Sequence, residues 1–477
     1  MRTPSDDLFN LIHSLTKREK LYFKRFWQNH KKEQYYMKLF DLIKNCSVYD
    51  EDSVKKKSKI PNFANVKNTL FNAILTSMRE CHSQNSIEIQ IREDITNIEL
   101  LFVKNLRGAA EKLIEKNIEK AQRSGKYEYL IELWTLKTLA FNVSYYKNTT
   151  LEKLQTPFRL IKSTLDNIKT AQFYYDQSNL ILYHVSKGLP ITGIQHLTAK
   201  EISVIEKKYA HSFRVLNELY KYLDYYFNDI KKDPGKSFEF TLKRCELIEK
   251  NNLTELYAES YLQILYNLGL YKVGLGKYDE TQQLLDKLKD HVLAKKNKSY
   301  RKQYLYYSLA LVYYTKTNQV QKGLTLIRSL NTETINNFQT SQKQIIYKRA
   351  AQFCFFAKQY KLSNKFLNYL MECGTNDMRA LAEIIKIIIR FEHQDYDFVI
   401  YSSNSLFKNL KKQKMLFPFE ESLLDFFRTE TKKLLLDHNK IHFLKELKKR
   451  VEMLDKQYLT RGMYTQFDFK GWMEGIS

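Results

Sequence analysis

The residues best suited to metal chemistry are His438 and His442, which are four positions apart and have Asp437 beside the first of them. Two histidines one helical turn apart can bind zinc. Asn439 is a typical helix-capping residue, however, and a helix that begins there would separate the two imidazoles. The sequence therefore predicts no metal site and no cofactor.

Motifs for catalysis give no stronger signal. The sequence contains no glycine-rich phosphate loop, no HExxH and no GxSxG. His82 adjoins Cys81 without a recognisable orienting partner, and carboxylates on helical surfaces are usually solvated or paired with lysine. We expect a protein that is not an enzyme and has no catalytic residue, although an active site built on helices can lack a short motif.

The cysteines indicate the compartment. They are odd in number and widely scattered, at Cys46, Cys81, Cys245, Cys354 and Cys373. This pattern is typical of reduced core thiols rather than of a disulfide framework or a zinc site. The first ten residues lack the features of a signal peptide, and no run of 18 uncharged apolar residues occurs. We therefore expect a cytoplasmic protein without a membrane span.

Composition limits the fold class. The chain of 477 residues has only 13 glycines and 6 prolines, and 43% of its residues are hydrophobic. Sheets with tight hairpins need glycine and proline, so an all-α chain with ample core material is expected.

The chain is strongly basic, with 78 lysines and arginines against 53 acids and a net charge of +25. Such a charge favours acidic partners, including nucleic acid. The same composition, rich in Lys, Asn, Ile, Tyr and Phe, is also typical of a protein encoded by an AT-rich genome. Because the charge is spread along the whole chain, it does not mark a dedicated binding surface.

The most informative stretch runs from Gln263 to Leu288. A small residue at Gly269 allows a second helix to approach closely, and Gly276 supplies the permissive backbone of a turn. Helical spacing on a buried face then follows, with Tyr278, Thr281, Leu285 and Leu288. This stretch resembles one tetratricopeptide repeat (TPR), a helix–turn–helix unit of about 34 residues.

Three later stretches match this unit after the turns that precede Val320, Tyr360 and Tyr396. The four starting positions are 42, 40 and 36 residues apart, and the excess over about 34 fits into loops. One helix pair cannot bury its apolar face alone, so neighbouring pairs must stack. We therefore predict a right-handed α-solenoid of TPR-like helical hairpins with a small N-terminal helical domain.

The predicted organisation has four segments. Residues 1–85 form the N-terminal helical domain, 88–231 long-helix hairpins with degenerate repeats, 236–415 the TPR-like repeats and 416–477 a C-terminal helical cap. Pro157 is expected to begin a long helix, and Asp233-Pro234-Gly235 to mark the turn before the better repeats.

The N-terminal domain has two interpretations. Val54, Ile60, Val66 and Leu70 have the spacing of a helix-turn-helix, whose second helix enters the major groove of DNA. Lysines would then lie near phosphates, at Lys55, Lys56, Lys57, Lys59 and Lys67. Lys55 and Ser58 stand where such a motif usually has Ala and Leu, which favours a small helical cap on the solenoid instead.

The two ends of the chain resemble a group of uncharacterised bacterial TPR-like proteins. The matching residues are Asp7-Leu8-Phe9 through Thr16-Lys17 with Tyr22-Phe23, and Phe467-Asp468-Phe469 with Trp472. This resemblance implies a helical architecture over the full length and carries no activity.

The predicted binding surface is the concave face, which the first helix of each pair lines. The repeat spacing assigns nine residues to it: Gln263, Tyr266, Asn267, Ser308, Lys316, Lys348, Arg349, Gln352 and Phe356. Cations, amides and aromatic rings suit an extended peptide, with Lys348 and Arg349 binding acidic groups. We expect a scaffold that binds a protein or peptide. The alternative is a regulator that contacts nucleic acid through its N-terminal domain and uses the repeats as a sensor. The sequence leaves open whether the groove is empty or filled by the chain itself.

Overall fold

The structure is a computed structural model of the chain. It describes residues 6–27, 34–46, 48–83, 86–143, 145–147, 149–293, 300–330, 334–335, 338–437, 440–454 and 463–474. Every regular element in these ranges is a helix, and none of the described residues forms a strand, so the predicted all-α class is confirmed. None of the described helices is long and apolar enough to cross a membrane.

The helices divide into two compact units. The first contains Met1–Asn179 and Gly193–Leu219, and the second contains Leu180–Thr192 and Tyr220–Ser477. This division is coarser than the four predicted segments, whose boundaries stay a prediction.

Helices α1 to α5 form the beginning of the first unit. Their bounds are α1 (Asp7–Ser14), α2 (Lys17–Trp27), α3 (Gln34–Lys44), α4 (Glu51–Ser58) and α5 (Phe63–Ser83). A capping box begins α2, because Thr16 and Glu19 exchange side-chain and backbone hydrogen bonds. Leu8, Phe23 and Leu70, from three different helices, are buried in one shared core.

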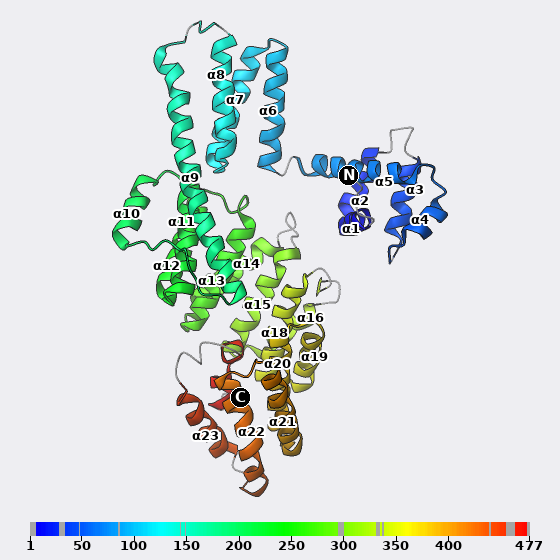
Figure 1. Cartoon of the computed structure of the whole chain (residues 1–477), viewed down its shortest axis with the longest axis vertical. Coiled ribbons are helices and arrows are strands. Elements are labelled where there is room, and N and C mark those ends of the chain that lie inside the picture. Colours follow the sequence, from blue (N-terminus) through cyan, green and yellow to red (C-terminus); the bar gives the residue numbers. More distant parts are fainter. Residues whose placement is uncertain are drawn as a thin grey trace. The chain divides into compact units, whose positions relative to one another are not determined.

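Longer helices follow in the same unit. They are α6 (Ile87–Val103), α7 (Arg107–Arg123), α8 (Tyr127–Val143), α9 (Leu151–Lys187), α10 (Ala199–Lys208) and α11 (Phe213–Tyr225), of which α9 and α11 continue into the second unit. Helices α6, α7 and α8 lie side by side (Figure 1). The predicted start of α9 at Pro157 is wrong: the helix begins at Leu151, where the Thr150 hydroxyl accepts from the Lys153 amide, and Pro157 lies inside it.

After α11 the second unit continues with a π-helical turn, η1 (Tyr226–Ile230), after which Asp233 caps α12 (Pro234–Lys250). Helices then pack in adjacent pairs. The pairs are α13 (Ala258–Gly274) with α14 (Tyr278–Leu293), α15 (Tyr300–Lys316) with α16 (Val320–Ser329), α18 (Thr340–Phe356) with α19 (Tyr360–Cys373), α20 (Asn376–Glu392) with α21 (Tyr396–Lys412), and α22 (Pro418–Asp437) with α23 (Lys440–Glu452). The chain ends with η2 (Tyr464–Gln466) and α25 (Phe469–Met473).

Four second helices, α14, α16, α19 and α21, begin at the residues that the repeat spacing predicted. Three positions into each helix, a small or β-branched residue is buried: Thr281, Gly323, Ser363 and Val399. A Cβ on Gly323 would lie 2.0 Å from the Phe353 ring, and one on Gly269 would lie 2.5 Å from Leu309. Close helix approach therefore explains both glycines.

The turns before these four helices share one backbone geometry. Two positions before each helix start, the backbone is left-handed, at Gly276, Asn318, Lys358 and Gln394. The next amide donates to a carbonyl five residues earlier, as from Lys277 to Lys272 and from Gln359 to Cys354. This is the hydrogen bond that ends a helix in a Schellman motif, and it fixes how each hairpin turns.

Candidate functional site

The nine predicted groove residues fall into two places. Four of them lie on α13 and α15 and contact each other: Gln263 donates to Asn267, and the Tyr266 hydroxyl lies 3.1 Å from the Ser308 hydroxyl. Ser308 is fully buried, so its hydroxyl joins two helices instead of facing a ligand. Asn267 lines a cavity together with Asp224 and Tyr271, and none of the other eight predicted residues lines that cavity.

The other five predicted residues come together. Lys316 of α15 and Arg349, Gln352 and Phe356 of α18 line one cavity of about 270 Å³, which we call the α15–α18 cavity. Lys348 adjoins it through its neighbour Arg349. Val312 and Thr315 of α15 also line it, and the opposite wall consists of Gln466, Phe467 and Asp468, which the sequence places more than 100 positions away.

That wall belongs to Met463–Glu474, which we call the C-terminal segment. Its polar groups form hydrogen bonds or ion pairs with three of the predicted binding residues. Lys348 Nζ donates to Gln466 Oε1 at 2.6 Å, the Gln352 amide donates to the Gln466 carbonyl, and Lys316 pairs with the Asp468 carboxylate.

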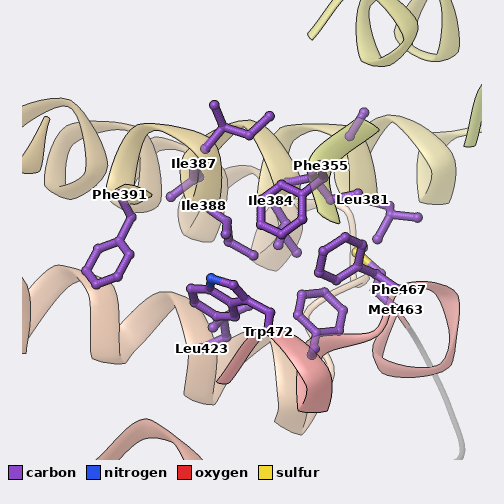
Figure 2. Close-up of a cluster of buried hydrophobic side chains, with 14 of the residues drawn as sticks. Phe355, Leu381, Ile384, Ile387, Ile388, Phe391, Leu423, Met463, Phe467 and Trp472 are labelled. Atoms are coloured by element: carbon purple, nitrogen blue, oxygen red, sulfur yellow. The ribbon is translucent and has the colours of Figure 1, made fainter. Parts of the chain in front are cut away.

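Aromatic rings anchor the same segment. Phe467 stacks on Phe356, with 5.4 Å between ring centroids, and meets Phe355 edge-on at 5.3 Å. Trp472 is fully buried, and its indole N–H donates to Glu392 at 2.9 Å. Figure 2 shows Trp472 beside Ile388 and Phe391 of α20, and Phe467 near Leu381 of the same helix. The segment therefore contacts α15, α18 and α20 in turn.

The start of the C-terminal segment is held by a buried acid. Glu420, in the first turn of α22, is fully buried and accepts from the Met463 amide at 2.6 Å. Burial raises the pKa of Glu420, although the backbone amides that donate to it act in the opposite direction. A backbone contact of this kind does not depend on which side chain occupies position 463.

The electrostatics of the cavity are unbalanced. Burial, together with the adjacent Arg349 charge, lowers the pKa of Lys348 to about 8. Arg349 forms no ion pair within the described part of the chain, its Nε has no acceptor there, and its Nη1 is 3.4 Å from Gln352 Oε1. The only carboxylate lining the cavity in the described residues, Asp468, already pairs with Lys316.

Sequence reasoning missed that the C-terminal segment enters this cavity. It recognised the aromatic residues from Phe467 to Trp472 but assigned them to a cap over the last helices. The available signal was the concentration of aromatic residues in one short stretch, at Phe467, Phe469 and Trp472, because large aromatic side chains need an apolar surface to bury against.

The lysines of the nucleic-acid alternative separate into two groups. Lys55, Lys56, Lys57 and Lys59 are exposed on α4 and the turn after it. Lys67 is buried and pairs with Glu51 at 2.5 Å. Burial alone would lower the pKa of Lys67, but hydrogen bonds with Glu51 and Tyr49 raise it overall. Lys67 therefore links α5 to α4 instead of facing solvent.

Among the described residues, the metal and thiol candidates form no recognisable site. His438 lies outside the described residues, while His442 is exposed and 3.3 Å from Glu446. The described residues contain no group of three side chains that could hold a metal ion. Burial raises the pKa of Cys245 and of Cys354 to about 12, so both are unreactive core thiols.

Comparison of the chain with protein-family models, with curated proteins and with solved structures found no match. The function must therefore be inferred from the residues of this chain.

Proposed function

We propose that this protein is a scaffold that binds a short segment of a partner protein along α15, α18 and α20. Its own C-terminal segment occupies that groove in the absence of the partner. The helix pairs from α13 to α23 form, in this proposal, a right-handed TPR-like solenoid whose first helices line a concave surface. No catalytic group is required.

The proposal rests on the contacts that hold the C-terminal segment against α15, α18 and α20. Lys348 and Gln352 bind the side chain and the carbonyl of a single residue, Gln466, while the next ring, Phe467, lies between Phe355 and Phe356. Contacts to both backbone and side chains are typical of peptide recognition in a groove. Such contacts would be available to any segment of similar chemistry.

A tethered occupant competes with a partner. A segment on the same chain has an effective concentration in the millimolar range, so a free peptide of equal affinity cannot displace it at micromolar concentration. A substitution that weakens the binding of the tethered segment should therefore make the groove available to a free peptide.

The test uses a fluorescent peptide with the sequence of residues 463–474 and the full-length protein. We expect Phe467→Ala in the protein to tighten peptide binding at least about tenfold, because the tethered competitor loses its ring contacts. Lys470→Ala is the matched control, since that side chain is 67% exposed and should leave the affinity unchanged. Adding Lys348→Met and Gln352→Ala to Phe467→Ala should abolish binding.

Two results would contradict the proposal. One is that the peptide binds none of these proteins at concentrations up to the solubility limit. The other is that binding survives the substitutions in Lys348 and Gln352, which would put the peptide elsewhere on the molecule.

A second candidate function follows from α4. Four exposed lysines within five positions, Lys55, Lys56, Lys57 and Lys59, could contact nucleic-acid phosphates. Titration of the full chain with duplex DNA at several salt concentrations tests this candidate. Replacement of all four lysines by serine should weaken binding and reduce its salt dependence, whereas an unchanged salt dependence would exclude α4 as the contact.

A further inference from the structure

The C-terminal segment leaves part of the positive charge in the groove uncompensated. Three cations line or adjoin the α15–α18 cavity, namely Lys316, Lys348 and Arg349, and the segment offers a carboxylate only to Lys316, through Asp468. Lys348 receives an uncharged amide oxygen from Gln466 at 2.6 Å, and no acid pairs with Arg349 in the described chain.

This arrangement is unfavourable for the folded protein. A partly buried cation without a counter-charge loses hydration and gains little in return. The lowered pKa of Lys348 has this cause, since burial and the Arg349 charge both disfavour the protonated amine. A carboxylate at the position of the Gln466 amide would face Lys348 directly, with Arg349 adjacent in sequence on the same helix.

We propose that the partner segment carries a glutamate where this chain has Gln466, followed by an aromatic residue and a second acid in the places of Phe467 and Asp468. This inference rests on the proposed function and specifies its ligand: an acidic–aromatic–acidic segment that presents a carboxylate to Lys348 as well as to Lys316. The protein's own segment is then an incomplete copy of that ligand.

The geometry favours glutamate over other acids. Glutamate and glutamine have the same length and shape, so a Glu side chain reaches Lys348 Nζ as Gln466 Oε1 does, at 2.6 Å. The backbone contact from Gln352 to residue 466 is unaffected by the exchange. Only the charge differs: the Lys348 ammonium would donate to a carboxylate instead of a neutral amide, so that Coulomb attraction in a partly buried site adds to the hydrogen bond.

The missing charge also gives the chain's own segment a function. An internal occupant that bound as tightly as the partner, and at a higher effective concentration, would never be displaced. Glutamine at position 466 lowers the affinity of the internal occupant, so that a partner with the additional carboxylate can compete for the groove.

The test compares two fluorescent peptides of residues 463–474, one with the natural sequence and one with Gln466→Glu, on the full-length Phe467→Ala protein. We expect the Glu peptide to bind at least about tenfold more tightly at low salt, with a smaller advantage at high salt. Adding Lys348→Met and Arg349→Gln to the protein should reduce the preference for the Glu peptide to near unity.

A second readout needs no peptide. Gln466→Glu in the otherwise natural protein should raise the melting temperature, because the tethered segment then offers a carboxylate to Lys348. Gln283→Glu is the matched control: it adds the same charge at an exposed residue within α14 and should change the melting temperature little.

The outcomes separate this inference from the proposed function. If both peptides bind equally well and Gln466→Glu does not stabilise the protein, the acidic ligand is excluded while peptide binding stands. If neither peptide binds, both proposals fail. A concentration-dependent dimer of the natural protein that exchanges C-terminal segments, detected by light scattering, would assign the groove to a second copy of the chain and overturn the inference.

Discussion

Lys348 is the residue where the electrostatics of the groove can be measured directly. Its pKa in the folded protein, about 8, lies below the 10.5 of an unperturbed lysine. Between these two values the unfolded chain binds more protons than the folded one, so the free energy of unfolding rises with pH. The protonated Lys348 destabilises the folded protein by its full amount below pH 8, and this amount is on the order of 3 kcal/mol.

We therefore predict that Lys348→Met stabilises the protein most at pH 7 and progressively less as the pH rises toward 10. Urea denaturation of both proteins at several pH values measures this difference. Lys470→Met, at an exposed position, should show no such trend. A stability difference that is the same at every pH would mean that Lys348 titrates as an ordinary surface lysine.

Gly323 carries a second prediction at the scale of single residues. Because a Cβ there would lie 2.0 Å from the Phe353 ring, Gly323→Ala must displace α16 or the ring. We expect a loss of roughly 1–3 kcal/mol in the free energy of unfolding, the usual range for overpacking. Gly108→Ala is the control, because no atom lies within 4 Å of that Cβ. Equal effects at both positions would show that α16 and α18 are not in close contact.

At the scale of the elements, the turns explain both what the sequence could predict and what it could not. Gly276 identified one turn, because glycine at such a position indicates left-handed backbone. Lys358 and Gln394 adopt the same conformation with φ of 58° and 60°, and neither residue type signals it. The helix starts were still predicted, because buried residues such as Ser363 and Leu367 recur at helical spacing after each turn.

This difference predicts opposite effects of two substitutions. Lys358→Gly should stabilise the protein by up to about 1 kcal/mol, since a residue with a Cβ is strained in left-handed backbone. Gly276→Ala should destabilise it by about 1–2 kcal/mol for the same reason. Gly274→Ala, two positions earlier in helical backbone with open space around it, is the control and should not destabilise. Melting temperatures of the three variants measure the effects, and a destabilising Lys358→Gly would contradict the turn geometry.

At the scale of the whole molecule, the sequence predicted the all-α class and the helix pairs but only part of the candidate site. Periodicity describes residues that are near one another in the chain, so it assigned Lys348, Arg349 and Gln352 correctly to one helix. It cannot report a contact such as that between Lys316 and Asp468, which are 152 positions apart. The same limit explains why Ser308, placed on the groove by spacing, is buried against Tyr266 instead.

The central claim is that the C-terminal segment lies in the groove of its own chain. Zero-length carbodiimide cross-linking measures this most directly, because it joins a lysine to a carboxylate only where the two form an ion pair. In the natural protein, mass spectrometry should find Lys316 joined to Asp468, and in a mixture of ¹⁴N- and ¹⁵N-labelled protein both peptides should carry the same label. The ion pair of 2.9 Å between Lys448 of α23 and Glu474 of the segment is the internal control. Absence of the Lys316–Asp468 cross-link while Lys448 is still joined to Glu474 would contradict the account. Cross-linked peptide pairs of mixed label would contradict it as well.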